Sequence, residues 1–123
     1  MNLDLKGKNA LVCGSSKGIG EAIAIELAHL GANDVLAARS LDKLETVCAS
    51  LDISKGQKHD VLQVDFNDST SLKISVKKIV DKQPIHILIN NTGGPKSGSI
   101  LNANPEEFAE AFHNHLVCSQ ILT

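Results

Sequence analysis

The sequence predicts a doubly wound α/β fold, in which helices cover both faces of a parallel sheet. Short apolar segments alternate with helical patterns four times along the chain. Turn-forming or cap-forming residues separate these units, and the glycine-rich stretch CGSSKGIG at positions 13–20 follows the first apolar segment. Right-handed crossovers between parallel strands then favour a Rossmann-like topology. At 123 residues, the chain is at most one domain.

The first two strand–helix units occupy roughly the first fifty residues. Residues 9–13 (NALVC) form an apolar strand, and residues 34–38 (DVLAA) form a second one. The helix between them is expected over 18–30, and Gly31 supplies a left-handed stop. Its apolar residues recur at helical spacing: Ile19, Ala22, Ile23, Leu27 and Leu30. Ser40 is expected to cap the next helix, whose inward face would be Leu41, Leu44, Val47, Cys48 and Leu51.

Two further units follow. Residues 60–66 and 85–90 are expected strands, and Asn67 or Asp68 opens a helix that ends before Pro84. A last helix starts at Asn104-Pro105, with a proline in its first turn and a glutamate three residues after the cap. It has no closing signal before Thr123, so we expect an N-terminal portion with four strand–helix units, truncated at its C-terminus.

Composition excludes several functional classes. A net charge of −2 without a basic cluster predicts no nucleic-acid partner. No apolar run approaches the roughly 20 residues of a membrane span, and the N-terminus lacks the apolar core of a signal peptide. Three widely spaced cysteines fit no metal or disulfide pattern, which predicts reduced thiols, no metal and a cytoplasmic protein. The histidines at 29, 59, 86 and 113 have no nearby partners and are expected to be structural or exposed.

The glycine-rich stretch has two interpretations. Glycines form tight turns in many proteins, and this one could be nothing more. A turn between a strand and a helix also presents unpaired backbone N–H groups and the positive end of the helix dipole. Glycine then allows the backbone to approach a pyrophosphate closely, which makes a dinucleotide site the preferred interpretation.

Over nearly its whole length, the chain resembles the short-chain dehydrogenase/reductase family, particularly its 3-oxoacyl-[acyl-carrier-protein] reductase-like members. The family's first turn reads TGxxxGIG, and here Cys13 stands in place of the threonine. The segment Asn90-Asn91-Thr92-Gly93 resembles the family's NNAG, with Thr92 in place of alanine. Asp65 matches the acidic residue that follows the third strand. The resemblance implies an NAD(P)-binding domain and an oxidoreductase.

The resemblance also implies a set of cofactor-binding residues. Asp65 would accept a hydrogen bond from the adenine amino group beside the Phe66 backbone, although it could instead cap the following helix. Asn91, Thr92 and Gly93 would pass close to the cofactor ribose. The phosphates and ribose would be wrapped by the glycine-rich turn, namely Gly14, Ser15, Ser16, Lys17, Gly18, Ile19 and Gly20.

The end of the second strand favours NADP(H) over NAD(H). Enzymes that use NAD tend to place a carboxylate there to bind the ribose 2′-OH, whereas this chain has Ala38. Arg39 and Ser40 follow, and a guanidinium can pair with a 2′-phosphate. In this family, a basic residue at the position of Lys17 often accompanies that phosphate. The alternative for Arg39 is an ordinary surface arginine.

The chain lacks the family's catalytic centre. Family members reduce a carbonyl by hydride transfer, with a tyrosine in a Tyr-x-x-x-Lys motif as proton donor, and this sequence contains no tyrosine. His115 stands where the family has a catalytic asparagine, and Asn114 points about 120° away on the helix. His115 would either hold a water in the proton relay or be a core histidine.

Two functions follow from this pattern. The first is part of an NADP(H)-dependent oxidoreductase, inactive as 123 residues alone, that reduces a ketone such as a 3-oxoacyl thioester. The second is a nucleotide-binding or interaction module without catalysis. The resemblance also implies a homodimer or homotetramer, because family members usually assemble through the helix that starts near Pro105 and the one after it.

Overall fold

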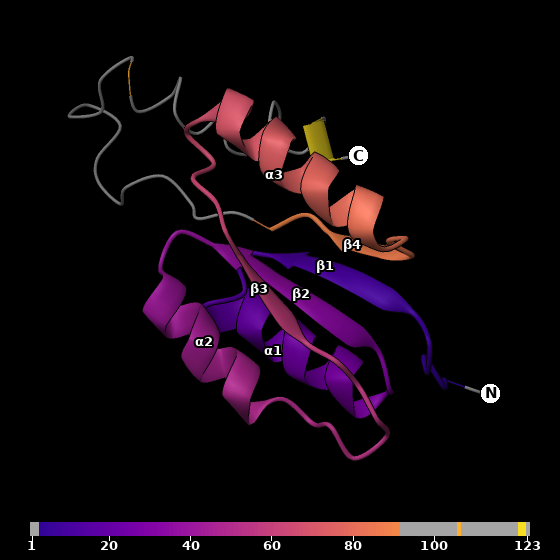
Figure 1. The fold of residues 1–123 in the computed structure, drawn as a ribbon. Helices are drawn as coiled ribbons and strands as arrows, with labels where there is room; N and C mark the ends of the chain where they lie inside the picture. The colour runs from indigo at the N-terminus through magenta and orange to yellow at the C-terminus, as the bar shows by residue number, and fades with distance from the viewer. Residues whose placement is uncertain (1–2, 92–105, 107–120, 123) are drawn as a thin grey trace.

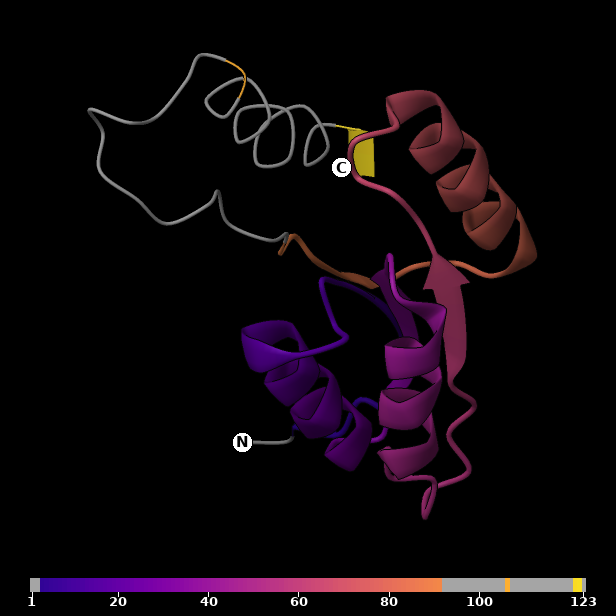
Figure 2. The ribbon, with the colours of Figure 1, turned by 90° about the vertical axis from the view of Figure 1, so that its left-hand side faces the viewer.

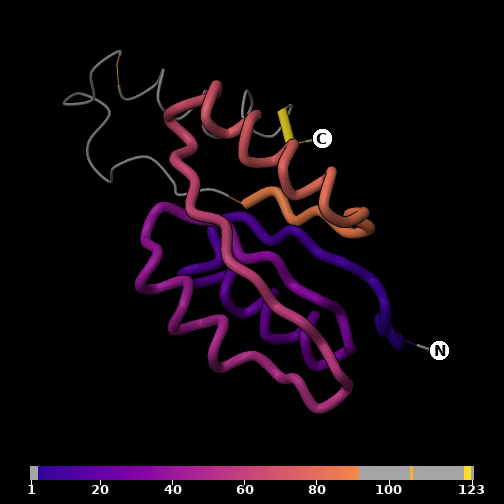
Figure 3. Tube along the Cα trace, viewed as in Figure 1, coloured from indigo at the N-terminus to yellow at the C-terminus, as the bar shows by residue number. Residues whose placement is uncertain are grey.

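A computed structural model describes residues 3–91, 106 and 121–122 of the chain, and it contains a four-stranded parallel sheet (Figure 1). The strands are β1 (Asn9–Cys13), β2 (Asn33–Ala38), β3 (Asp60–Gln63) and β4 (Ile87–Ile89). They lie in the order β3-β2-β1-β4, and every neighbouring pair is parallel. The chain therefore leaves β3, passes through a helix, and returns beside β1 (Figure 3). This arrangement confirms the predicted Rossmann-like sheet.

Helices cover both faces of this sheet. The helices α1 (Gly18–His29) and α2 (Leu41–Ser50) lie on one face, and α3 (Ser69–Lys82) lies on the other (Figure 2). A core of α1, α2 and sheet side chains fills the first layer, with Leu36 and Leu44 completely buried in it. A second core, which includes Leu11 and Leu72, fills the layer beneath α3.

The apolar pattern of α1 predicts its packing poorly. Ile19 is 73% exposed, and the residues that α1 buries are Gly20, Ala24 and Ala28, at intervals of four. Small side chains let this helix approach the sheet closely, so its larger apolar residues lie at the margins of the contact. The pattern of α2 predicts better, since Leu44 and Val47 are buried, although Leu41 is 37% exposed.

The structure shortens both outer strands relative to the predicted ranges, 60–66 and 85–90. Within the described part of the sheet, each has a neighbour on one side only, and the pairing ends after four residues for β3 and three for β4. Asp68 caps α3 by accepting a hydrogen bond from the Ser71 N–H at 3.0 Å, which resolves the choice between Asn67 and Asp68. Gly31 has a φ of +102° just after α1, as predicted.

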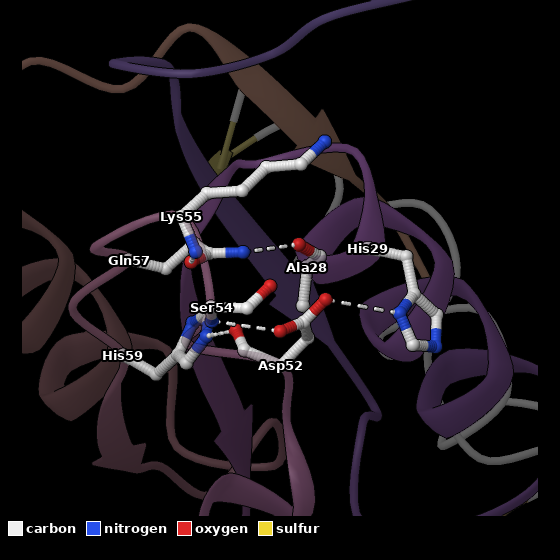
Figure 4. Close-up of polar contacts among 7 residues, drawn as sticks. All are labelled: Ala28, His29, Asp52, Ser54, Lys55, Gln57 and His59. Carbon is white, nitrogen blue, oxygen red and sulfur yellow. Dashed lines mark hydrogen bonds and ion pairs between the residues drawn. The ribbon is translucent and has the colours of Figure 1, made fainter.

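Polar contacts join the segment between α2 and β3 to the C-terminal end of α1 (Figure 4). Gln57 Nε2 donates to the carbonyl oxygen of Ala28 at 2.7 Å, and His29 Nδ1 lies 3.3 Å from the Asp52 carboxylate. His59 Nδ1 accepts the Asp34 N–H at 3.1 Å. His86 Nδ1 likewise accepts the Asn9 N–H at 2.9 Å, from 77 residues away in the chain. The prediction that the histidines lack partners is therefore wrong for these three, and His113 lies outside the described residues.

Candidate functional site

A pocket of about 570 Å³ opens at the carboxyl ends of the strands. It lies where the sheet order reverses, between β1 and β4, which is where open α/β sheets bind ligands. Five segments contribute to it: the turn after β1, the end of β2, the first turn of α2, and the residues that follow β3 and β4. Its lining consists of Gly14, Ser16, Lys17, Gly18, Ala38, Arg39, Ser40, Lys43, Phe66 and Asn91.

Glycines determine the shape of the turn after β1. Gly14 has a φ of +62°, and a Cβ built there would lie 2.6 Å from the carbonyl oxygen of Asn91. A Cβ on Gly20 would collide with the carbonyl of Gly14. Gly18 has a φ of +61°, but a Cβ there would meet open space. The turn therefore needs Gly14 and Gly20 for packing, while the bare Gly18 backbone faces a space that a ligand can enter.

The N-terminus of α1 lies at this pocket and has no side-chain cap. Its N-cap residue is Lys17, in an extended conformation, with no capping hydrogen bond from its side chain. The first amides of a helix have no partner inside the helix, and a lysine ammonium cannot accept from them. Together with the helix dipole, they form a cradle suited to an anion.

Three cations line the pocket. Among the described residues of the lining they are Lys17 at the start of α1, Arg39 after β2 and Lys43 in the first turn of α2, and none of those lining residues carries a carboxylate. Lys43 is not among the site residues predicted from the sequence. A signal for it exists, because a lysine three residues after the Ser40 N-cap opposes the helix dipole and therefore suggests a function other than helix stability.

Ser40 occupies the N-cap of α2, but its side chain makes no capping hydrogen bond. Ser40 therefore occupies the predicted cap position, but the capping hydrogen bond is not formed. Because Ser40 lines the pocket, its hydroxyl is placed to serve a ligand there.

Other predicted site residues lie close to the pocket without lining it. Ser15 is completely buried, and its Oγ has no hydrogen-bond partner among the described residues. Ile19 is exposed, and Gly20 packs against Gly14. Asp65 is exposed and accepts the Asn67 N–H at 2.9 Å, forming a local turn rather than the N-cap of α3. The roles of these four residues in cofactor binding stay predictions.

Three predicted residues lie outside the described part of the chain: Thr92, Gly93 and His115. Of the predicted set after β4, the structure describes Asn91. Its side-chain Nδ2 donates to the carbonyl oxygen of Gly14 at 3.5 Å, which joins the turn after β1 to the end of β4.

The strongest electrostatic perturbation lies away from the pocket. Asp34 is completely buried at the start of β2, and burial raises its pKa from 3.8 to about 7. Within the described ranges, neither of its carboxylate oxygens has a hydrogen-bond partner. Burial also raises the pKa of the Cys48 thiol, with the nearby charges of Asp60 and Asp34 adding to the effect. We therefore infer no reactive thiolate at Cys48.

The described residues hold neither a metal centre nor a membrane helix. No group of three or more histidines, cysteines, aspartates or glutamates is positioned to bind a metal ion in that part of the chain. None of the helices described there has both the length and the apolar character needed to cross a membrane.

The sequence and the structure both have clear relatives. A model of the short chain dehydrogenase family matches residues 8–121. L-Rhamnose 1-dehydrogenase (NADP(+)) of Thermoplasma acidophilum is 38% identical over 92 residues, which cover 74% of this chain and 36% of that protein.

Two solved structures show the same architecture. L-Sorbose reductase from Gluconobacter frateurii, complexed with NADPH and L-sorbose, matches with a TM-score of 0.88 and 30% identity, over 99% of this chain and 47% of its own. The 3-oxoacyl (acyl-carrier-protein) reductase of Agrobacterium tumefaciens with NADP bound matches with a TM-score of 0.87 and 26% identity, over 98% and 46%. The chain thus spans less than half the length of these relatives.

Proposed function

The chain belongs to the short-chain dehydrogenase family, and on that premise we propose that it is the cofactor-binding part of an NADP(H)-dependent oxidoreductase. The observation that carries this proposal is the pocket, whose described lining residues include three cations and no carboxylate. A carboxylate at the end of β2 would bind a ribose 2′-OH and repel a phosphate, whereas Ala38 and Arg39 occupy that place. The NADPH and NADP complexes among the solved relatives support the same cofactor.

The residues of this pocket would hold and orient the cofactor. The amides at the start of α1 and the bare Gly18 backbone would bind its pyrophosphate, and Lys17 and Arg39 would bind its 2′-phosphate. Phe66 and Asn91 would border the rest of the dinucleotide. When bound, NADPH supplies a hydride to a carbonyl carbon.

We propose a ketone as the substrate, such as a 3-oxoacyl thioester. The 3-oxoacyl reductase among the solved relatives supports this class, while L-sorbose reductase and L-rhamnose 1-dehydrogenase act on sugars. No residue of this chain is assigned as the proton donor, because the sequence contains no tyrosine. That role would fall to residues outside these 123. His115 is proposed to hold a water in the relay or to pack in the core.

A second candidate is a nucleotide-binding or interaction module without catalysis. The absence of tyrosine from the 123 residues favours it for this chain taken by itself. We further propose that the protein is cytoplasmic, because its widely spaced cysteines fit no disulfide pattern, and, by analogy with the family, that it forms a homodimer or homotetramer. Sedimentation of the purified protein would test the assembly.

Direct binding tests the cofactor. Isothermal titration of the purified protein with NADPH and with NADH should show at least about tenfold tighter binding of NADPH, since charge-assisted hydrogen bonds would form only with the 2′-phosphate. Equal affinities would contradict the proposal.

A further inference from the structure

We propose that Lys43 is a third cationic residue, after Lys17 and Arg39, that determines specificity for the cofactor, and that it binds the 2′-phosphate with the help of the neighbouring Ser40 hydroxyl. This inference rests on the proposed function. It extends that function to a residue on a different element, in the first turn of α2 rather than in the glycine-rich turn or at the end of β2.

The position of Lys43 supports this role. Lys43, Arg39 and Ser40 all line the same pocket, and they come from one short stretch that turns from β2 into α2. The end of β2 is where this fold recognises the 2′ position of the ribose. Two cations and a hydroxyl that makes no capping hydrogen bond therefore line the pocket at the end of β2, where a 2′-phosphate would bind.

The local electrostatics indicate that the expected ligand is an anion. Lys43 is the third residue of α2, at the helix end that carries partial positive charge. Arg39 is exposed just before this helix and adds a second positive charge. Without a ligand, these like charges repel one another. A phosphate bound between them would attract both cations and so outweigh their mutual repulsion. A neutral ribose hydroxyl cannot do this.

A second, smaller hollow adjoins the pocket and shares Lys43 with it. It has a volume of about 270 Å³ and is lined by Ser16, Glu21, Asp42, Lys43, Thr46 and Val47. Lys43 and Ser16 line both hollows, so Lys43 lies on the boundary between an acidic and a basic surface.

The two carboxylates of the second hollow do not fix the Lys43 ammonium. No ion pair joins Glu21 or Asp42 to Lys43 in the described part of the chain. Their charges partly offset the repulsion among the cations while leaving the ammonium available to a ligand. The difference in charge between the two hollows also explains why a 2′-phosphate would bind in the first hollow only, because the carboxylates of the second would repel it.

The experiment compares ligands with and without the 2′-phosphate on variants of one position. Affinities for NADPH, NADH, adenosine 2′,5′-bisphosphate and adenosine 5′-monophosphate are measured by isothermal titration. Lys43→Gln should weaken binding of the two 2′-phosphate ligands about tenfold and change the other two less than about twofold. Lys43→Arg should retain most of the preference for ligands that carry the 2′-phosphate. Lys77→Gln, an exposed lysine of α3 on the opposite face of the sheet, should behave like the unmodified protein.

The possible outcomes separate this inference from the proposed function. If the unmodified protein prefers NADPH and Lys43→Gln keeps the full preference, the role of Lys43 is wrong and the cofactor proposal stands. A uniform loss of all four ligands would also contradict a role specific to the 2′-phosphate. If the unmodified protein has no preference for NADPH, both proposals are wrong.

Discussion

The side-chain amide of Asn91 donates to the carbonyl oxygen of Gly14 at 3.5 Å, which joins the residue after β4 to the residue after β1. The Gly14 N–H in turn donates to the carbonyl oxygen of Ala37 in β2 at 2.8 Å. One glycine thus connects the carboxyl ends of three neighbouring strands. The floor of the pocket depends on this junction, and two substitutions test its packing.

Gly14→Ala should destabilise the fold strongly. Its Cβ would lie 2.6 Å from the carbonyl oxygen and 2.8 Å from the Nδ2 of Asn91, in a backbone conformation with a φ of +62°. We expect the free energy of unfolding to fall by about 2 to 4 kcal/mol, from left-handed strain and overpacking together. Urea denaturation followed by circular dichroism would measure the loss.

Gly18→Ala is the matched control. Its φ of +61° is nearly the same, but its Cβ would meet nothing within 4 Å, so only the backbone strain of about 1 to 2 kcal/mol remains. If the two variants lost equal stability, contact with Asn91 would not be the reason for glycine at position 14.

Arg39→Asp should reverse or abolish the preference for NADPH. The carboxylate would repel a 2′-phosphate and could accept from a ribose hydroxyl, as in enzymes that use NAD. We expect NADPH binding to weaken by about 100-fold, with little change for NADH, in isothermal titration. The affinity of Arg39→Gln for NADPH should fall between those of the unmodified protein and Arg39→Asp. An equal loss of both ligands in a folded variant would show that Arg39 does not read the phosphate.

Alternating apolar segments and turn signals predict most of this fold. The four strands, their parallel arrangement and a helix cap at Asn67 or Asp68 follow from local patterns, because strands buried on both faces and helix caps have strong sequence signatures. The glycine-rich turn and Arg39 could also be found, since each lies directly after a buried strand. Lys43 is harder to find, because its place in the first turn of α2 is a weak signal, and a lysine in a polar stretch resembles a solvated surface residue until the pocket is known.

Packing and long-range polar contacts are less visible in the sequence. The contact surface of α1 is built from Gly20, Ala24 and Ala28, whose small size matters more than their hydrophobicity. The partners of His29 and His59 come from distant parts of the chain and cannot be read from neighbouring residues.

The 123 residues alone should have no reductase activity. The family's proton donor is a tyrosine, and this sequence has none, so a bound NADPH would meet no assigned acid. Ketone-dependent oxidation of NADPH, followed by absorbance with acetoacetyl-CoA as the ketone, should stay at the background rate. A 3-oxoacyl reductase assayed in parallel serves as the positive control. Measurable turnover by the purified chain would contradict the expectation and would point to a different acid.

Asp34 should make the protein less stable as the pH rises from about 4 to about 7. Its folded-state pKa of about 7 lies above the ordinary aspartate pKa of 3.8, because burial opposes ionisation. Below pH 4 the carboxyl is neutral in both states; between 4 and 7 only the unfolded chain ionises, which favours unfolding, and above 7 the effect is complete. The total is about 4 kcal/mol.

The side-chain oxygens of Asp34 have no hydrogen-bond partner in the described residues, so an amide of similar shape tests this effect directly. Urea unfolding of Asp34→Asn between pH 4 and pH 8 should show a flatter profile than the unmodified protein, with the stability difference growing in favour of the variant as the pH rises. Asp81→Asn, at an exposed position of α3, should keep the original slope. Parallel profiles for the unmodified protein and Asp34→Asn would mean that Asp34 does not carry the pH dependence.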